Sequence, residues 1–266
     1  MELQTLWAAL VLYVLAGSLA IFGVVLRRPL ERAVLGLLVA GLLLHTASIA
    51  LRWERLGHGP VTTMFEMLSS NIWSLLLIYT LAYWRIPAIR ATAAVVMPIL
   101  FVMMGWLLML SPQEGVLLMS FVTVLLYIHI GLGKIFLGCV LVAVGISGIV
   151  LLRSKNNSRF ARLPDSSRLD ELAFRFMALG LIFETLMLIV GAIWAQGAWG
   201  RYWAWMPLET WAFITWLSIV FALHVRHTYK ISPRTFALMI VGVFVLAFLT
   251  FYGMPFISTS FHQGTF

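Results

Sequence analysis

The chain has 266 residues, of which 62% are hydrophobic and only 11% are charged, and its mean hydropathy is +1.00. A soluble domain carries charge on roughly a quarter of its residues, so this composition excludes a water-soluble globular protein and requires lipid as the solvent for most of the chain. The formal charge of +8 does not indicate a nucleic-acid partner, because the basic residues lie in short segments between apolar runs, where they signal membrane orientation.

Eight apolar runs follow one another along the chain, each close to the roughly 20 residues that an α-helix needs to cross a bilayer. The first run follows Glu2 without an early Lys or Arg, unlike a cleavable signal peptide, so we expect a retained helix. The sequence therefore predicts an all-α, polytopic integral membrane protein with a single membrane domain over 1–266. The predicted transmembrane helices cover residues 5–26, 33–52, 69–84, 91–110, 125–152, 173–195, 209–229 and 234–254.

The distribution of Lys and Arg predicts the orientation of these helices. One side of the membrane would carry fourteen of the eighteen basic residues, and the other side would carry Arg52, Arg55, Lys134 and Arg201. Because basic residues concentrate in cytoplasmic loops, the side with fourteen is predicted to be cytoplasmic. With eight crossings, both termini are then predicted to lie on the outer face.

Two outer segments are apolar, too short to cross a membrane, and adjacent to polar residues. We therefore expect a short amphipathic helix on the outer face near 61–70 or 114–124, with Glu66 on the outer surface if the first segment forms it.

Two polar residues fall inside predicted spans. His45, in the second helix, is expected to be a hydrogen-bonded residue of the bundle rather than a metal ligand. Glu184, midway along the sixth helix, would be costly in lipid unless it is paired, protonated or functional.

Tryptophan is concentrated in one outer segment, between the sixth and seventh helices. Six of the eleven tryptophans fall between Trp194 and Trp216. An aromatic belt would spread tryptophan over many helix ends at both interfaces, so the clustering favours a flat apolar binding platform over a belt. The predicted platform residues are Trp199, Arg201, Trp203, Trp205, Glu209 and Trp211.

Two histidines are also predicted to lie at the outer surface, His129 near the start of the fifth helix and His262 beyond the eighth. Haem is a flat, apolar disc with anionic propionates, and its iron accepts two axial imidazoles. Tryptophan faces suit the ring, and an arginine suits a propionate. Histidines and the tryptophan platform together predict haem as the ligand.

The tryptophan segment, WAQGAWGRYWAWMPLETWAFITWLSIVFALH, resembles the "WWD" signature of haem-handling membrane proteins. The resemblance is to the CcsA/ResC type of system II cytochrome c biogenesis protein, and it extends over most of the chain. The segments LHTASIALRWERLGHGPVTTMFE, LLYIHIG and FYGMPFISTSFH resemble other segments of that family.

This resemblance implies specific roles for three histidines. His129 and His262 take the family's two external histidine positions, where both would bind the iron of one haem b. His224, in the segment WLSIVFALHVR, takes the intramembrane histidine position, which in the family pairs with a histidine of a ResB/CcsB-like membrane subunit. His224 is about 22 Å deeper than Glu209 on one helix, so it is not expected to share an iron with the outer pair.

The tryptophan segment departs from the family pattern at one position. The family reads W-x-W-D-P, whereas Met206 stands between Trp205 and Pro207 here. If the acidic side chain orients the loop, another group must do so in this chain, and Glu209 is the candidate.

The leading hypothesis is therefore a haem-handling subunit of cytochrome c maturation that delivers haem across the membrane and presents it for covalent attachment to apocytochrome c. As part of a cytochrome c synthase (haem lyase), it would act by positioning haem beside a C-x-x-C-H segment, with no side-chain nucleophile. The expected location is the bacterial cytoplasmic membrane, rather than the plastid thylakoid membrane. Two alternatives remain open: a HemX-like regulatory protein that does not attach haem, and a transporter of another flat hydrophobic molecule.

Overall fold

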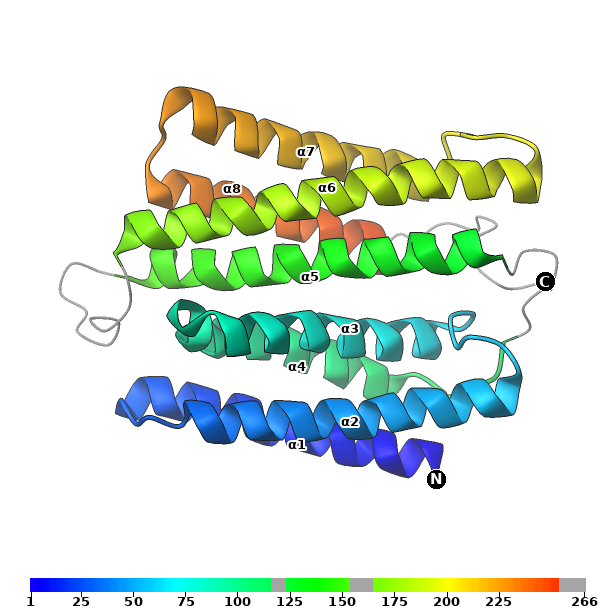
Figure 1. Ribbon diagram of the computed structural model, residues 1–266, viewed down its shortest axis with the longest axis horizontal. Helices are drawn as coiled ribbons and strands as arrows, with labels where there is room; N and C mark the ends of the chain where they lie inside the picture. Colours follow the sequence, from blue (N-terminus) through cyan, green and yellow to red (C-terminus); the bar gives the residue numbers. More distant parts are fainter. Residues whose placement is uncertain (116–122, 154–164, 254–266) are drawn as a thin grey trace. The chain divides into compact units, whose positions relative to one another are not determined.

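The computed structural model describes residues 1–115, 123–153 and 165–253. In these ranges every regular element is helical, and eight helical segments are long and apolar enough to cross a membrane. The predicted all-α, eight-helix architecture of a polytopic membrane protein is therefore confirmed. The chain divides into two compact units (Figure 1), which are described separately; the single domain over 1–266 stays a prediction.

The first unit comprises residues 1–115 with the segment 152–165. Helices α1 and α2 lie side by side as an antiparallel pair (Figure 1) and are joined by a short turn. The turn starts at Arg27, which ends α1 in the left-handed conformation (φ 55°). The helices of this unit are α1 (Glu2–Leu26), α2 (Glu31–Leu56), α3 (Met64–Arg85), the 3₁₀-helix η1 (Pro87–Thr92) and α4 (Ala93–Met109).

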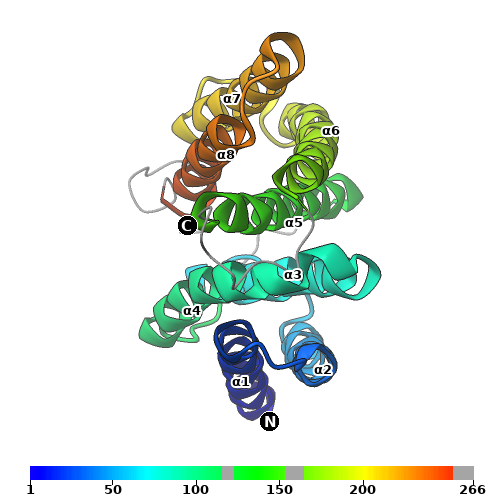
Figure 2. The same ribbon diagram turned by 90° about the vertical axis from the view of Figure 1, so that its left-hand side faces the viewer.

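The second unit comprises residues 116–151 and 166–266. Helices α6, α7 and α8 each pack against the other two (Figure 2). Ser232 caps α8 by accepting a hydrogen bond from the backbone N–H of Thr235 at 3.1 Å. Pro233 lies in the first turn, where a backbone N–H would have no acceptor within the helix, so the lack of one in proline costs nothing. The helices are α5 (Val124–Leu152), α6 (Ser166–Trp199), α7 (Pro207–Tyr229), α8 (Pro233–Phe248) and the π-helical turn η4 (Leu249–Gly253).

The structure has no separate amphipathic helix near 61–70, which removes the first of the two expected places. Residues from Met64 onward are the first turns of α3, five residues before the predicted start of that span. The polar first turn belongs to the long helix because Thr63 and Glu66 form a capping box, which satisfies backbone N–H groups at the helix start. Most of the second expected helix, over 114–124, lies outside the described residues.

Glu66 is also not on an outer surface, because its side chain is buried and paired with Arg52. The guanidinium donates to Oε1 of Glu66 from Nε at 2.9 Å and from Nη2 at 2.8 Å, and to Oε1 of Glu2 at 2.8 Å. It also donates to the backbone carbonyl of Gln113 at 2.7 Å. Arg52 therefore ties α1, α2, α3 and the segment after α4 together. His45 is fully buried, with Nε2 3.0 Å from the hydroxyl of Ser69, which confirms the expected hydrogen-bonded bundle histidine.

Candidate functional site

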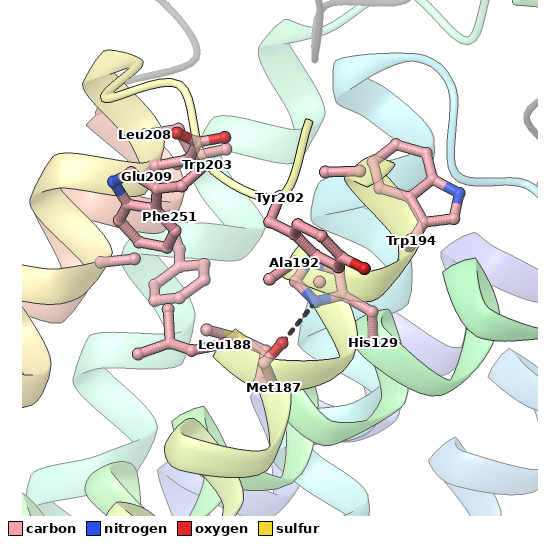
Figure 3. Close-up of a pocket in the computed structure, with 13 residues that line it drawn as sticks. His129, Met187, Leu188, Ala192, Trp194, Tyr202, Trp203, Leu208, Glu209 and Phe251 are labelled. Atoms are coloured by element: carbon pink, nitrogen blue, oxygen red, sulfur yellow. Dashed lines mark hydrogen bonds between the residues drawn. The ribbon is translucent and has the colours of Figure 1, made fainter. Parts of the chain in front are cut away.

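A cavity of about 70 Å³ lies in the second unit, where α5 begins, α6 ends and α7 begins. This end of the unit is the one predicted to face outward. Figure 3 shows the cavity between His129 on one side and Trp203 and Phe251 on the other. Most of the walls are apolar. The lining residues are His129, Met187, Leu188, Gly191, Ala192, Trp194, Ala195, Tyr202, Trp203, Leu208, Glu209, Ala212 and Phe251.

His129 is held in one orientation by a backbone group of α6. Its Nδ1 lies 2.9 Å from the carbonyl oxygen of Met187 (Figure 3). Because a carbonyl oxygen can only accept, Nδ1 carries the hydrogen and donates it. In the neutral ring Nε2 then keeps its lone pair, which is the form of imidazole that binds metals. A hydrogen bond from the other ring nitrogen to a backbone carbonyl fixes both the tautomer and the orientation of a histidine that binds a metal.

Glycine at position 191 makes room for this contact. A Cβ atom at Gly191 would lie 2.6 Å from Cε1 and 2.7 Å from Nδ1 of His129, closer than real Cβ contacts allow. Gly191 is one helical turn after Met187, so a side chain there would stand beside the carbonyl that His129 reaches. Gly133 leaves room in the same way for Met187, whose sulfur would lie 2.9 Å from an added Cβ.

The loop between α6 and α7 supplies aromatic walls. It begins at Gly200 in the left-handed conformation (φ 73°), a usual residue for a helix end. The ring of Trp203 packs edge-on against Trp205 at 5.8 Å and Phe213 at 6.3 Å. Phe213 in turn stacks on Trp216 at 5.8 Å with 10° between the planes. The aromatic surface thus continues from the loop along α7.

Trp203 also carries a buried hydrogen-bond donor. Its indole N–H is closed off from solvent, and none of the described residues accepts a hydrogen bond from it. Buried indole N–H groups usually have a partner. Trp203 therefore combines an apolar ring in the cavity wall with a buried donor that no described residue uses.

Glu209 reaches back from the first turn of α7 to the loop. Its Oε2 accepts hydrogen bonds from the backbone N–H groups of Ala204 at 2.9 Å and Met206 at 3.2 Å. The carboxylate thereby orders the loop that carries Trp203 and Trp205, which matches the expectation that Glu209 orients this segment.

The structure brings three of the predicted site residues to the cavity, namely His129, Trp203 and Glu209. Trp205 is 68% exposed beside Trp203, and Trp199 packs against the cavity residue Trp194 with ring centroids 5.0 Å apart. Arg201, Trp211 and His224 are not among the lining residues: Arg201 is exposed in the loop, and the other two lie on α7. His262 lies outside the described residues.

His224 belongs to a different part of the second unit. It is fifteen residues past Glu209 on α7, a separation of about 22 Å along a helix, and it is exposed. The prediction that it does not share a site with His129 agrees with this placement.

Met187, Gly191 and Phe251 were not predicted as site residues. Met187 contributes a backbone carbonyl, which has no signature in the sequence, and Phe251 comes from the π-helical turn η4. Gly191 could have been noticed in the sequence, because a glycine inside an apolar helix often marks a place of close packing.

Glu184 lies on α6, about one turn from Met187. It is fully buried, and neither carboxylate oxygen has a hydrogen-bond partner within 1–115, 123–153 and 165–253. The predicted alternative of a paired Glu184 is therefore not observed among these residues.

The donor set fits a ligand that brings its own metal rather than a free metal ion. In the part of the chain that the structure describes, no three His, Cys, Asp or Glu side chains gather to hold a metal. A single imidazole among aromatic walls suits a haem iron, because the porphyrin itself supplies the iron's in-plane ligands.

Comparison with known proteins decides the family. Residues 61–262 match the model of the cytochrome c assembly protein family, which is more than half of the chain. The chain belongs to this family. Curated relatives include the cytochrome c biogenesis protein CcsA of Prochlorococcus marinus (strain MIT 9312), 28% identical over 96% of this chain and 92% of that protein. CcsA of Chlamydomonas reinhardtii is 27% identical over 82% of this chain and 64% of that protein.

A solved structure, that of the cytochrome c haem lyase CcmF, matches with a TM-score of 0.74 at 18% identity. The match covers 95% of this chain and 46% of CcmF, so the chain spans about half the length of that protein. At this identity the likeness shows the fold alone. The family match and the CcsA relatives, rather than this structural likeness, confirm the resemblance to the CcsA type that the tryptophan segment indicated.

Proposed function

We propose that this member of the cytochrome c assembly family is a haem-handling membrane subunit of cytochrome c maturation. It delivers haem across the membrane and presents it at the outer face for covalent attachment to apocytochrome c. The observation that carries the proposal is His129, whose Nδ1 is bound to the Met187 carbonyl, so that Nε2 keeps its lone pair in an aromatic cavity. The family match and the CcsA relatives support the same function.

The size of the cavity supports a ligand that rests on the loop rather than one enclosed by it. Its volume of about 70 Å³ is well below the roughly 300–1,000 Å³ of pockets that enclose ligands. A porphyrin is a flat ring with two apolar faces, which suits an open surface of tryptophan side chains. Trp205 and Tyr202 are 68% and 60% exposed and extend that surface beyond the cavity.

Within this proposal the residues have distinct tasks. His129 and His262 would together hold the iron of haem b, as the family resemblance implies. Arg201, exposed in the loop, pairs with a propionate, while Trp199, Trp203, Trp205 and Trp211 form the aromatic surface. His224 contributes to a separate inner haem site together with a histidine of a ResB/CcsB-like partner subunit.

The chain contributes to the reaction by positioning. A bound haem would supply the two vinyl groups that react with the thiols of a C-x-x-C-H segment of an apocytochrome, and the histidines and tryptophans of this chain would hold it where such a segment can reach it. Holding the reactants in this geometry replaces an encounter in solution by a step within one complex. The proposed location is the bacterial cytoplasmic membrane, and the charge asymmetry supports an outward-facing tryptophan loop.

A second function is favoured by one specific residue. Met206 occupies the position of the acidic residue in the family's tryptophan signature, and a HemX-like regulatory protein that binds haem without attaching it has less need of that residue. Gene neighbourhood separates the two functions, since a ResB-like gene accompanies maturation, whereas haem-synthesis genes accompany regulation.

Purification from a haem-replete bacterial host tests the proposal. We expect the protein to carry a Soret band with bis-histidine character, and to support covalent haem attachment to a C-x-x-C-H reporter cytochrome when the ResB-like subunit is present. Haem without attachment would favour the regulatory function. A colourless protein that does not take up added haem would contradict both.

A further inference from the structure

Trp205 has a backbone conformation that tryptophan rarely adopts. Its φ is 56°, in the left-handed region. Among the described residues, the other non-glycine residues with positive φ are Arg27 and Lys230, and both of them end helices, where this conformation is common. Trp205 instead lies inside the loop before α7. A bulky side chain at positive φ is strained, so other contacts must hold it there.

Two neighbouring side chains of α7 supply those contacts. Oε2 of Glu209 accepts from the N–H of Ala204 at 2.9 Å and from the N–H of Met206 at 3.2 Å. The hydroxyl of Thr210 donates to the carbonyl of Trp205 at 3.2 Å. The peptide group that joins Trp205 to Met206 is therefore held at both its carbonyl and its N–H. One carboxylate oxygen holds backbone N–H groups on both sides of Trp205.

The same type of residue caps α3 without this consequence. There Oε2 of Glu66 accepts from the N–H groups of Thr62 at 2.9 Å and Thr63 at 3.3 Å. Thr62 stands immediately before the N-cap, as Trp205 does, and its φ is not positive. A glutamate in the first helical turn thus requires no left-handed residue before it. The conformation of Trp205 is a particular property of the loop before α7.

We propose that Glu209 and Thr210 form a clamp that holds Trp205 in the left-handed conformation and so presents its indole at the surface. Turning φ of Trp205 to a negative value would redirect its Cβ and remove the edge-on contacts of its ring with Trp203 at 5.8 Å and Phe213 at 6.5 Å. Glu209 is then a positioning residue. It orders the loop through its carboxylate, which the methionine at position 206 lacks. The contacts of the clamp do not depend on any ligand, whereas its use in binding haem rests on the proposed function.

The clamp is tested by limited chymotrypsin digestion of the haem-free full chain in detergent, following fragments cut within residues 201–206. Glu209→Ala should speed this cleavage about fivefold or more, the factor expected from losing hydrogen bonds to two backbone N–H groups. Glu209→Gln keeps an acceptor oxygen and should recover most of the protection. Ser232→Ala, which removes a cap at the other end of the same unit, is the matched control and should leave this cleavage unchanged.

Trp205→Gly separates a clamp from an ordinary helix cap. Glycine adopts positive φ at little cost, so in the Trp205→Gly background Glu209→Ala should speed cleavage much less than it does in the natural chain. Equal acceleration in both backgrounds would overturn the clamp. On adding haem, Glu209→Ala but not Glu209→Gln should weaken the Soret band, and Soret bands of equal strength would also contradict the assignment. Failure of every variant and of the natural chain to bind haem would instead contradict the proposed function and leave the cleavage result standing.

Discussion

The Nδ1 atom of His129 on α5 donates a hydrogen bond to the carbonyl oxygen of Met187 on α6, over 2.9 Å. This bond crosses between two helices and leaves Nε2 as the nitrogen with a lone pair. For the proposed role of His129 as an iron ligand, this bond would set the ring in one tautomer and one orientation before any ligand arrives.

Gly191→Ala should weaken haem binding without removing any ligand. The added methyl group would meet the His129 ring at 2.6 Å, so the ring must leave the Met187 carbonyl. Loss of the hydrogen-bond partner of a ligating histidine lowers metal affinity by about 10–100-fold, and a similar loss is expected in a haem titration followed at the Soret band. Gly197→Ala, on the same helix with no atom within 4 Å of the new methyl group, is the matched control. Equal haem affinity of the two variants would contradict the positioning of His129 by Met187.

The helical architecture is largely readable from the sequence because each span is a long apolar run. The ends are less readable because local capping decides them: α3 starts at Met64 rather than at 69, since Thr63 and Glu66 cap it and Arg52 neutralises the buried carboxylate. The sequence also predicts Glu66 at the outer surface, because nothing close to it in the sequence indicates a buried partner. Its partner lies fourteen residues earlier on another helix, and such a pairing has no local pattern.

Part of the candidate site could be predicted from the sequence. The tryptophan cluster and the resemblance predicted His129, Trp203 and Glu209, which the structure brings to one cavity. The carbonyl of Met187 was not predictable, because any residue has one. The left-handed Trp205 was also not predictable, because sequence rules expect glycine or asparagine at such a position.

Arg52→Met should destabilise the first unit strongly. The side chain is 5% exposed and pairs with Glu66, which is 1% exposed. Removing one partner of a buried pair costs about 3–5 kcal/mol, because the other charge is left buried without compensation. Thermal unfolding in detergent should show a clear drop for Arg52→Met and only partial loss for Arg52→Met combined with Glu66→Gln. Arg55→Met removes a more exposed arginine that also pairs with Glu2, and it should change the midpoint little. Equal loss from Arg52→Met and Arg55→Met would show that burial of the pair is not what matters.

Glu184→Leu should leave stability unchanged or raise it. The carboxyl group is fully buried on α6, and none of the residues described here bonds to either oxygen. Replacing an unsatisfied buried polar group by an apolar side chain of similar size removes a desolvation penalty of about 1–3 kcal/mol. The measurement is the thermal midpoint in detergent, with Leu186→Ala on the same helix, 42% exposed, as a control for loss of apolar surface. A large fall in the midpoint would show that Glu184 has a stabilising partner. A stable variant that no longer supports cytochrome maturation would assign the carboxyl group a function.

His129→Ala tests the central claim most directly. The protein should be purified with haem alongside His227→Ala, which removes an exposed histidine at the far end of α7, and the two absorption spectra compared. The account predicts that His129→Ala shifts the Soret band or lowers haem occupancy, that added imidazole partly restores the natural spectrum, and that His227→Ala changes neither. An unaltered Soret band and full haem occupancy in His129→Ala would contradict the assignment of His129 as the iron ligand of this site.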